Sequence, residues 1–262
     1  MTPTIVEGAL LFGAATLAGA LNSVAGGGSF ISFPALLFTG VAPVIANATN
    51  TAALWPAGVA SAFTYRKDMR TPRRVLVGLG AASLAGGIAG SMLLLRTRET
   101  TFVRLIPFLL LVATLLFTFG NAVTAKLRAR KGSGETHAPI ALASGALLQL
   151  VISVYGGYFG GGMGIMMLAT LSIMGMSDIH AMNGLKTLLG TLINGASVVL
   201  FLIAGAVDWG PGAVMVVGGT LGGWGGAALA RRIDPKAVKR FVMIVAWGMT
   251  AYFFFDAFGR GH

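Results

Sequence analysis

Lys186 is the residue whose chemistry fits its surroundings least. Among 19 Lys and Arg residues it is the one inside a long apolar block, 179–206. It follows Ile179 by seven residues, which is roughly 10 Å along a helix. A charge in apolar surroundings is costly unless it is paired, and this block has no Asp or Glu. A bound anion is the natural counter-charge. The alternative is a structural lysine whose ammonium reaches along the helix to a polar surface.

Amide and hydroxyl side chains form two clusters in apolar stretches. The first cluster is Asn47, Thr49, Asn50 and Thr51, and the second is Asn183, Lys186 and Thr187. Such groups can bind the oxygens of a sulfonate or a carboxylate. They can also join helices by hydrogen bonds, which contribute about 0.6 kcal/mol each on average in membranes. Two clusters at corresponding places favour a binding site.

Glycine runs interrupt two apolar blocks, 8–39 and 138–174. The interrupting residues are Gly26, Gly27, Gly28 and Ser29 in the first block, and Gly160, Gly161 and Gly162 in the second. We expect each block to form two shorter helices whose new N-termini offer unpaired N–H groups to an anion. The alternative role of these glycines is close helix packing. Nucleotide binding does not fit, because no strand precedes either run.

The composition predicts an integral membrane protein. Hydrophobic residues make up 55% of the 262 residues and charged residues 10%, against about 25% charged in soluble domains. Eight apolar blocks, most of them close to the length of a membrane span, are expected to be helices because they lack the alternation of strands. The fold class is therefore an all-α membrane protein with 8–10 helical segments. The net charge of +11 lies in short runs between the blocks, so the expected partner is the lipid bilayer and not nucleic acid.

The chain reads as two related halves. A shift of 136 residues superposes Asn47 on Asn183 and Thr51 on Thr187, and a shift of 134 superposes the two glycine runs. Lys186 then aligns with Asn50. The predicted division is 1–125 for the first repeat, 126–137 for a basic cytoplasmic linker and 138–262 for the second repeat.

Charge asymmetry orients the two repeats. The basic segments Arg66–Arg74, 126–137 and Arg231–Arg240 are expected to be cytoplasmic. Equivalent loops then lie on opposite faces, so the repeats have inverted topology and both termini lie outside. The three basic residues of Arg96–Arg104 count against this orientation.

Other kinds of site find no support in the sequence. The three His residues, at positions 137, 180 and 262, are scattered, and there is no Cys. We therefore predict no metal site, no cofactor and no enzymatic activity. No midspan carboxylate indicates a proton relay.

The stretch Ala18–Asn50 contains GALNSVAGGGSFISFPALLFTGVAPVIANATN, and the second half repeats its pattern as GGYFGGGMG followed by HAMNGLKT. This pattern resembles the sulfite exporter TauE/SafE family. The resemblance implies a carrier in the bacterial inner membrane for sulfite, a sulfonate or a related organic anion. It also implies that the glycine breaks and the polar clusters form the substrate region.

These observations predict a secondary transporter, more specifically an exporter, of a small anion. It would work by alternating access, with a midplane site between the repeats. Moving one negative charge out of the cell gains about 2.3 kcal/mol per 100 mV, so export needs no coupling. An anion channel and a proton-coupled uptake permease remain as alternatives. The sequence leaves open the substrate, protons as coupling ion and a homodimeric state.

Overall fold

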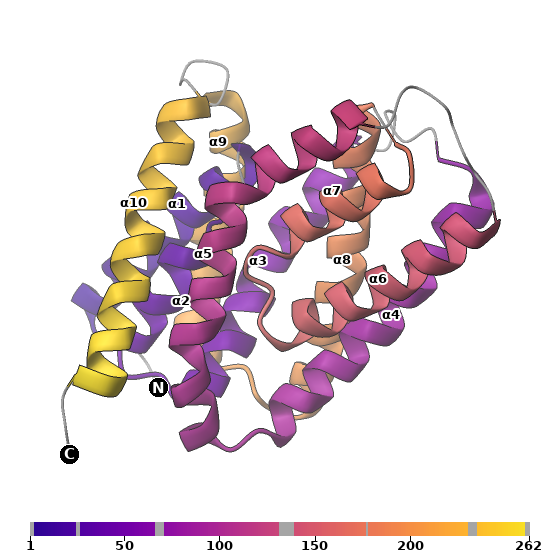
Figure 1. The fold of residues 1–262 in the computed structure, drawn as a ribbon. Coiled ribbons are helices and arrows are strands. Elements are labelled where there is room, and N and C mark those ends of the chain that lie inside the picture. Colours follow the sequence, from indigo (N-terminus) through magenta and orange to yellow (C-terminus); the bar gives the residue numbers. More distant parts are fainter. Residues whose placement is uncertain are drawn as a thin grey trace. The chain divides into compact units, whose positions relative to one another are not determined.

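A computed structural model describes residues 3–24, 27–65, 71–130, 139–176, 178–229 and 235–259. Within these ranges the chain forms ten α-helices and a final π-helical turn, with no strand (Figure 1). This confirms the all-α class. The elements are α1 (Ile5–Val24), α2 (Ser29–Phe38), α3 (Pro43–Tyr65), α4 (Arg73–Arg96), α5 (Glu99–Arg130), α6 (Pro139–Tyr158), α7 (Met163–Ile173), α8 (Ile179–Ile203), α9 (Trp209–Leu229), α10 (Pro235–Phe254) and η1 (Phe255–Gly259).

Both blocks that contain a glycine run are broken into two helices. The new helices, α2 with 10 residues and α7 with 11, are about 15 Å long, half the thickness of a bilayer core. Gly27 (φ 86°), Gly160 (φ 82°) and Gly162 (φ 77°) adopt left-handed backbone conformations. Such conformations are available to glycine at little cost, which explains the residue type at these turns.

Five helices are long and apolar enough to cross a membrane. They are the segments Ile5–Asn22 of α1, Arg73–Arg96 of α4, Glu99–Gly120 of α5, His180–Ile203 of α8 and Lys239–Phe258 of α10 with η1. The predicted block 43–65 is helical as α3, but it is outside this set; its first half carries the polar cluster Asn47–Thr51.

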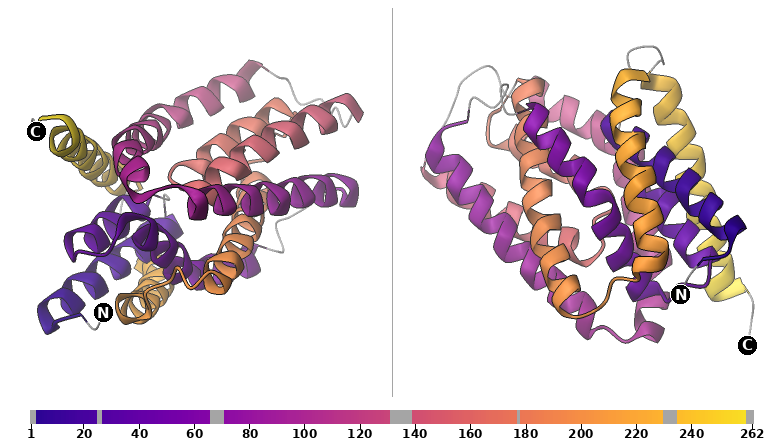
Figure 2. Two further views of the ribbon diagram at one scale, coloured as in Figure 1. Left: turned by 90° about the horizontal axis from the view of Figure 1, so that it is seen from below. Right: turned by 180° about the vertical axis from the view of Figure 1, so that it is seen from behind.

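The chain divides into two compact units, each built from both halves of the sequence. Unit 1 comprises Met1–Ala57, Leu95–Thr114 and Phe201–His262, and unit 2 comprises Gly58–Leu94 and Leu115–Leu200. In unit 1, α1 packs along α9, and α2 contacts both α1 and α10. In unit 2, α4 and α6 run side by side (Figures 1 and 2). Gly86 and Gly90 of α4 face the backbone of α6 there.

The core of unit 2 packs α8 against α4 and α7. Its fully buried side chains include Leu79, Met167, Leu171, Leu185 and Leu189. This packing fixes α8, and with it Lys186, beside the first turns of α7.

Several predicted segments fall partly outside the described residues. Helix α5 continues to Arg130, so the beginning of the predicted linker 126–137 is helical, and residues 131–137 are outside the description. Gly26 and residues 66–70 are outside it as well. The membrane orientation and the positions of the termini stay predictions.

Candidate functional site

Lys186 lies on α8 with its aliphatic stem beside Gly164, in the first turn of α7. Its Nζ donates a hydrogen bond to Oδ1 of Asn183 over 3.1 Å. It forms no ion pair with any carboxylate among the described residues. A Cβ placed on Gly164 would lie 3.3 Å from Cδ of Lys186, so the missing side chain of Gly164 makes room for the lysine stem. The stem of Lys186 thus lies beside a helix N-terminus, and its ammonium has no protein counter-charge among these residues.

The glycine break before α7 leaves backbone N–H groups unused. In the described part of the chain, the N–H groups of Gly161, Gly162 and Gly164 have no hydrogen-bond acceptor. The turn is stabilised by a hydrogen bond to one of its carbonyl groups, because the hydroxyl of Tyr155 donates to the carbonyl of Gly161 over 2.6 Å. Unused N–H groups and the positive end of the helix dipole attract an anion. Lys186 is the basic residue whose stem packs against this turn, at Gly164.

The structure brings together Lys186 and Asn183, but it gives Thr187 a different role. The Thr187 hydroxyl donates to the carbonyl of Asn183 over 2.8 Å, so its proton is used within α8. The side-chain nitrogen of Asn183 has no acceptor among the described residues. The donors of the second cluster are therefore Lys186 and Asn183.

The first glycine break is closed by its own hydrogen bonds. The N–H of Gly28 donates to Oδ1 of Asn22 over 2.8 Å. The N–H groups of Phe30 and Ile31 donate to the carbonyls of Gly27 and Gly28 over 3.1 and 3.0 Å. At the second break the N–H groups of Met163 and Ile165 donate in the same way, to the carbonyls of Gly160 and Gly162 over 3.4 and 3.0 Å. The difference is that Asn22 accepts the N–H of Gly28, so the first break has fewer N–H groups without an acceptor than the second.

Asn22 was missed by the sequence analysis, because it lies in the last turn of α1 and accepts an N–H six residues further along the chain. In the alignment of the two halves its counterpart is Gly156, which has no side chain to close the second break. This difference explains why two glycine runs of similar sequence behave differently.

Replacing Asn22 with Ala should destabilise the protein by about 1 kcal/mol, the usual net contribution of one hydrogen bond. For a chain of this size that lowers the melting temperature by roughly 2–4 °C. Asn22→Asp is the matched control, because it keeps an acceptor for the Gly28 N–H. A melting temperature unchanged in Asn22→Ala and equal to that of the control would show that the contact does not close the break.

The polar cluster of α3 is mostly structural. The hydroxyl of Thr51 donates to the carbonyl of Asn47 over 2.9 Å, and that of Thr49 accepts the N–H of Asp208 over 2.9 Å. Asn50 differs, because it is 4% exposed and its Oδ1 has no partner. Asn50 thus has a buried side-chain oxygen without a partner. It is also the residue of this cluster that aligns with Lys186.

A carboxylate already occupies one helix N-terminus of unit 1. The backbone N–H of Val44, at the start of α3, donates to the two carboxylate oxygens of Glu99 over 3.3 and 3.2 Å. The sequence analysis did not single out Glu99, because its partner is 55 residues away in the chain.

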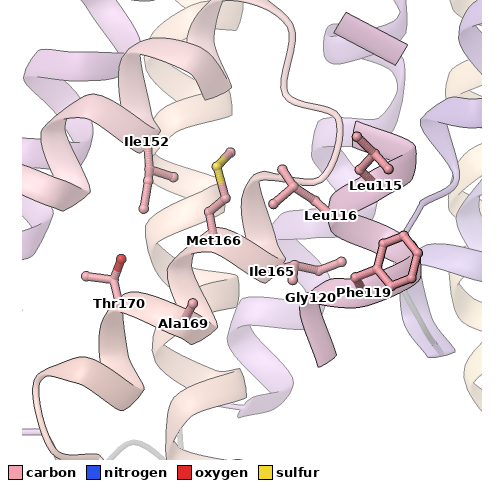
Figure 3. A pocket seen from close by; sticks show the side chains of 9 residues that line it. All are labelled: Leu115, Leu116, Phe119, Gly120, Ile152, Ile165, Met166, Ala169 and Thr170. Atoms are coloured by element: carbon pink, nitrogen blue, oxygen red, sulfur yellow. The ribbon is translucent and has the colours of Figure 1, made fainter. Parts of the chain in front are cut away.

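A pocket of about 530 Å³ on another face of α7 is apolar (Figure 3). Its lining residues are Leu115, Leu116, Phe119, Gly120, Ile152, Ile165, Met166, Ala169 and Thr170. Thr170 is the one polar residue among them, so the pocket suits hydrocarbon and not an anion. Among the described residues, no group of three or more His, Asp or Glu could hold a metal ion.

Comparison with known proteins identifies the family. Residues 11–253 match the family described as Sulfite exporter TauE/SafE. The chain belongs to the TauE/SafE family. It is 32% identical over 250 residues to a "Probable membrane transporter protein" of Haemophilus influenzae, covering 95% of this chain and 94% of that one. It is 28% identical over 258 residues to the "Probable membrane transporter protein YfcA" of Escherichia coli, covering 96% and 91%. No solved structure matches the chain.

Membership of the TauE/SafE family confirms the resemblance seen in the sequence. The protein is a multi-pass membrane protein of a transporter family and not an enzyme. Both glycine breaks and both polar clusters lie within the matched residues 11–253.

Proposed function

We propose that this TauE/SafE protein is a secondary transporter that exports a small oxyanion, such as sulfite, a sulfonate or a related organic anion. The observation that carries the proposal is the position of Lys186. Its ammonium has no carboxylate partner among the described residues, and its aliphatic stem packs beside Gly164, in the first turn after the second glycine break. Charged side chains within membrane helices usually mark the path of a substrate or an ion.

The donors at this place match the acceptors of an oxyanion. The Lys186 ammonium has three N–H groups, of which one binds Asn183. Its remaining N–H groups, the Asn183 side-chain nitrogen and the N–H groups of Gly161, Gly162 and Gly164 are available for oxygens. Hydrogen bonds to a charged group contribute about 1.5–3 kcal/mol each. In this proposal the second break, with Lys186 and Asn183, binds the anion.

We also infer that the two halves are inverted repeats, and equivalent packing contacts support this. The shifts that align the halves carry Gly86 onto Gly222 and Leu150 onto Thr16. A Cβ on Gly86 would lie 2.7 Å from the carbonyl oxygen of Leu150, and one on Gly222 would lie 1.9 Å from that of Thr16. Each pair is a close approach between a helix of the first half and a helix of the second. Exchanging the two halves turns one pair into the other.

A second contact fits a two-fold relation between the halves. The hydroxyls of Thr114 on α5 and Thr250 on α10 are hydrogen-bonded over 2.9 Å and are 136 residues apart. A residue that contacts its own counterpart lies on the axis relating the two copies. Inverted repeats with broken helices are typical of carriers that alternate access around a midplane site.

Export follows from the charge of the substrate. With a negative cell interior, an anion that leaves gains about 2.3 kcal/mol per charge and 100 mV. The carrier would then run on the membrane potential from the bacterial inner membrane, with both termini outside.

A thermal-shift screen of the detergent-purified protein tests the proposal. Sulfite, sulfate, thiosulfate, sulfonates and carboxylates are compared with neutral solutes and with cations as their chloride salts. At 100 times its dissociation constant, a true ligand stabilises the folded protein by about 2.7 kcal/mol. We expect one class of oxyanion to raise the melting temperature. Stabilisation by a cation or a neutral solute alone would overturn the anion assignment.

A further inference from the structure

Three buried polar side chains meet where α4 crosses α6. Ser83 and Ser153 are 0% exposed and Gln149 is 1% exposed. The side-chain nitrogen of Gln149 donates to Oγ of Ser83 over 2.9 Å and to Oγ of Ser153 over 3.3 Å. Ser83 and Gln149 both stand near the middle of their helices, and the proposed anion site does not use either of them.

Two hydrogen-bonding atoms of this cluster, the Gln149 oxygen and the Ser83 hydroxyl proton, have no partner among the described residues. Oε1 of Gln149 has no partner. The Ser83 hydroxyl accepts a bond from Gln149 but has no acceptor for its own proton among the described residues. The other buried serines all donate to the carbonyl four residues earlier; they are Ser32, Ser91, Ser153, Ser172 and Ser197. Each buried polar group without a partner costs about 1–3 kcal/mol.

Packing of the two helices does not account for these side chains. In the repeat alignment, which rests on the proposed function, Ser83, Gln149 and Ser153 correspond to Gly219, Ala15 and Gly19. There α1 and α9 meet backbone to backbone, since a Cβ on Gly19 would lie 2.1 Å from the Gly219 carbonyl oxygen. At these three positions the α1–α9 crossing has no polar side chain, while the α4–α6 crossing has three.

We propose that the crossing of α4 and α6 binds a water molecule between Gln149 and Ser83, in the middle of the membrane. Water can donate to Oε1 and accept from the Ser83 hydroxyl, so it satisfies both unspent groups. A cation would leave the hydroxyl proton without an acceptor, and an anion would leave Oε1 without a donor. With O and N of the amide exchanged, Ser83 donates to the amide oxygen and the remaining amide N–H is a donor that water accepts. Buried waters typically satisfy such groups.

Gln149 offers a direct test in the unaltered protein, because it is the one Gln in the sequence. Cell-free synthesis with side-chain ¹⁵N-glutamine gives a single amide signal by NMR in nanodiscs. We expect a cross-peak between this amide and water, and exchange with D₂O at least about tenfold faster than that of buried backbone amides. An amide without a water cross-peak, as protected as the backbone, would overturn the proposal.

A pair of cysteine variants tests Ser83 in the same way, because the chain has no Cys of its own. Ser83→Cys and Ser91→Cys lie on one helix at positions that are both 0% exposed, but the Ser91 hydroxyl is satisfied by Gly87. Infrared spectroscopy follows the change from S–H to S–D in D₂O. We expect faster exchange at position 83; equal protection would contradict the water site. Neither measurement uses an anion, so a failure here is separate from a failure of the Lys186 site.

Discussion

Replacing Lys186 with Met should weaken binding of the oxyanion found in the screen by at least about tenfold and leave the fold intact. The variant removes the ammonium, whose hydrogen bond to an anion contributes about 1.5–3 kcal/mol, and each 1.4 kcal/mol is a factor of ten in the dissociation constant. The fold should persist because Lys186 makes no ion pair among the described residues and because Met keeps a long apolar stem beside Gly164. Titration calorimetry of the purified variant gives the dissociation constant, and its melting temperature without ligand reports stability.

Two further substitutions separate the role of Lys186 from a general effect of charge. Lys239→Met removes a positive charge from α10, which is not an element of the proposed site, so its dissociation constant should match that of the parent. Lys186→Arg keeps the charge and should bind more tightly than Lys186→Met. A dissociation constant for Lys186→Met within about twofold of the parent value, less than 0.5 kcal/mol, would remove Lys186 from the site.

Sequence alone could single out Lys186 as a candidate site residue, because a single charge inside an apolar block is visible without any structure. It could also place both breaks, since glycine runs interrupt two blocks that are too long for one span. It could not tell the two breaks apart. At the first break the N–H of Gly28 donates to the side chain of Asn22. At the second break the N–H groups of Gly161 and Gly162 have no acceptor among the described residues. Nothing in a run of glycines specifies these partners.

The sequence predicted which segments are helical better than it predicted which helices pack together. The two compact units each take helices from both halves of the sequence, because α1 pairs with α9 and α4 with α6. Hydrophobic patterns mark which segments are apolar, but in a chain that is apolar on most faces they do not mark which helix packs on which. The extension of α5 to Arg130 was missed because its polar end was interpreted as a linker, although Lys, Arg, Ala and Leu all favour helix.

Gly222→Ala should be among the most destabilising single substitutions in this chain. A Cβ at this position would lie 1.9 Å from the carbonyl oxygen of Thr16 and 2.6 Å from its carbonyl carbon, and backbone atoms cannot move aside as a side chain can. Helices α1 and α9 would have to separate, so we expect a loss of about 3 kcal/mol, the upper part of the usual range for overpacking. That corresponds to a fall in melting temperature of roughly 6–12 °C. Gly225→Ala on the same helix is the control, because no atom lies within 4 Å of its Cβ and Ala favours helix by up to about 1 kcal/mol. If both variants melted at the same temperature, the close contact between α1 and α9 would be wrong, and with it one of the two packing pairs that support the repeat.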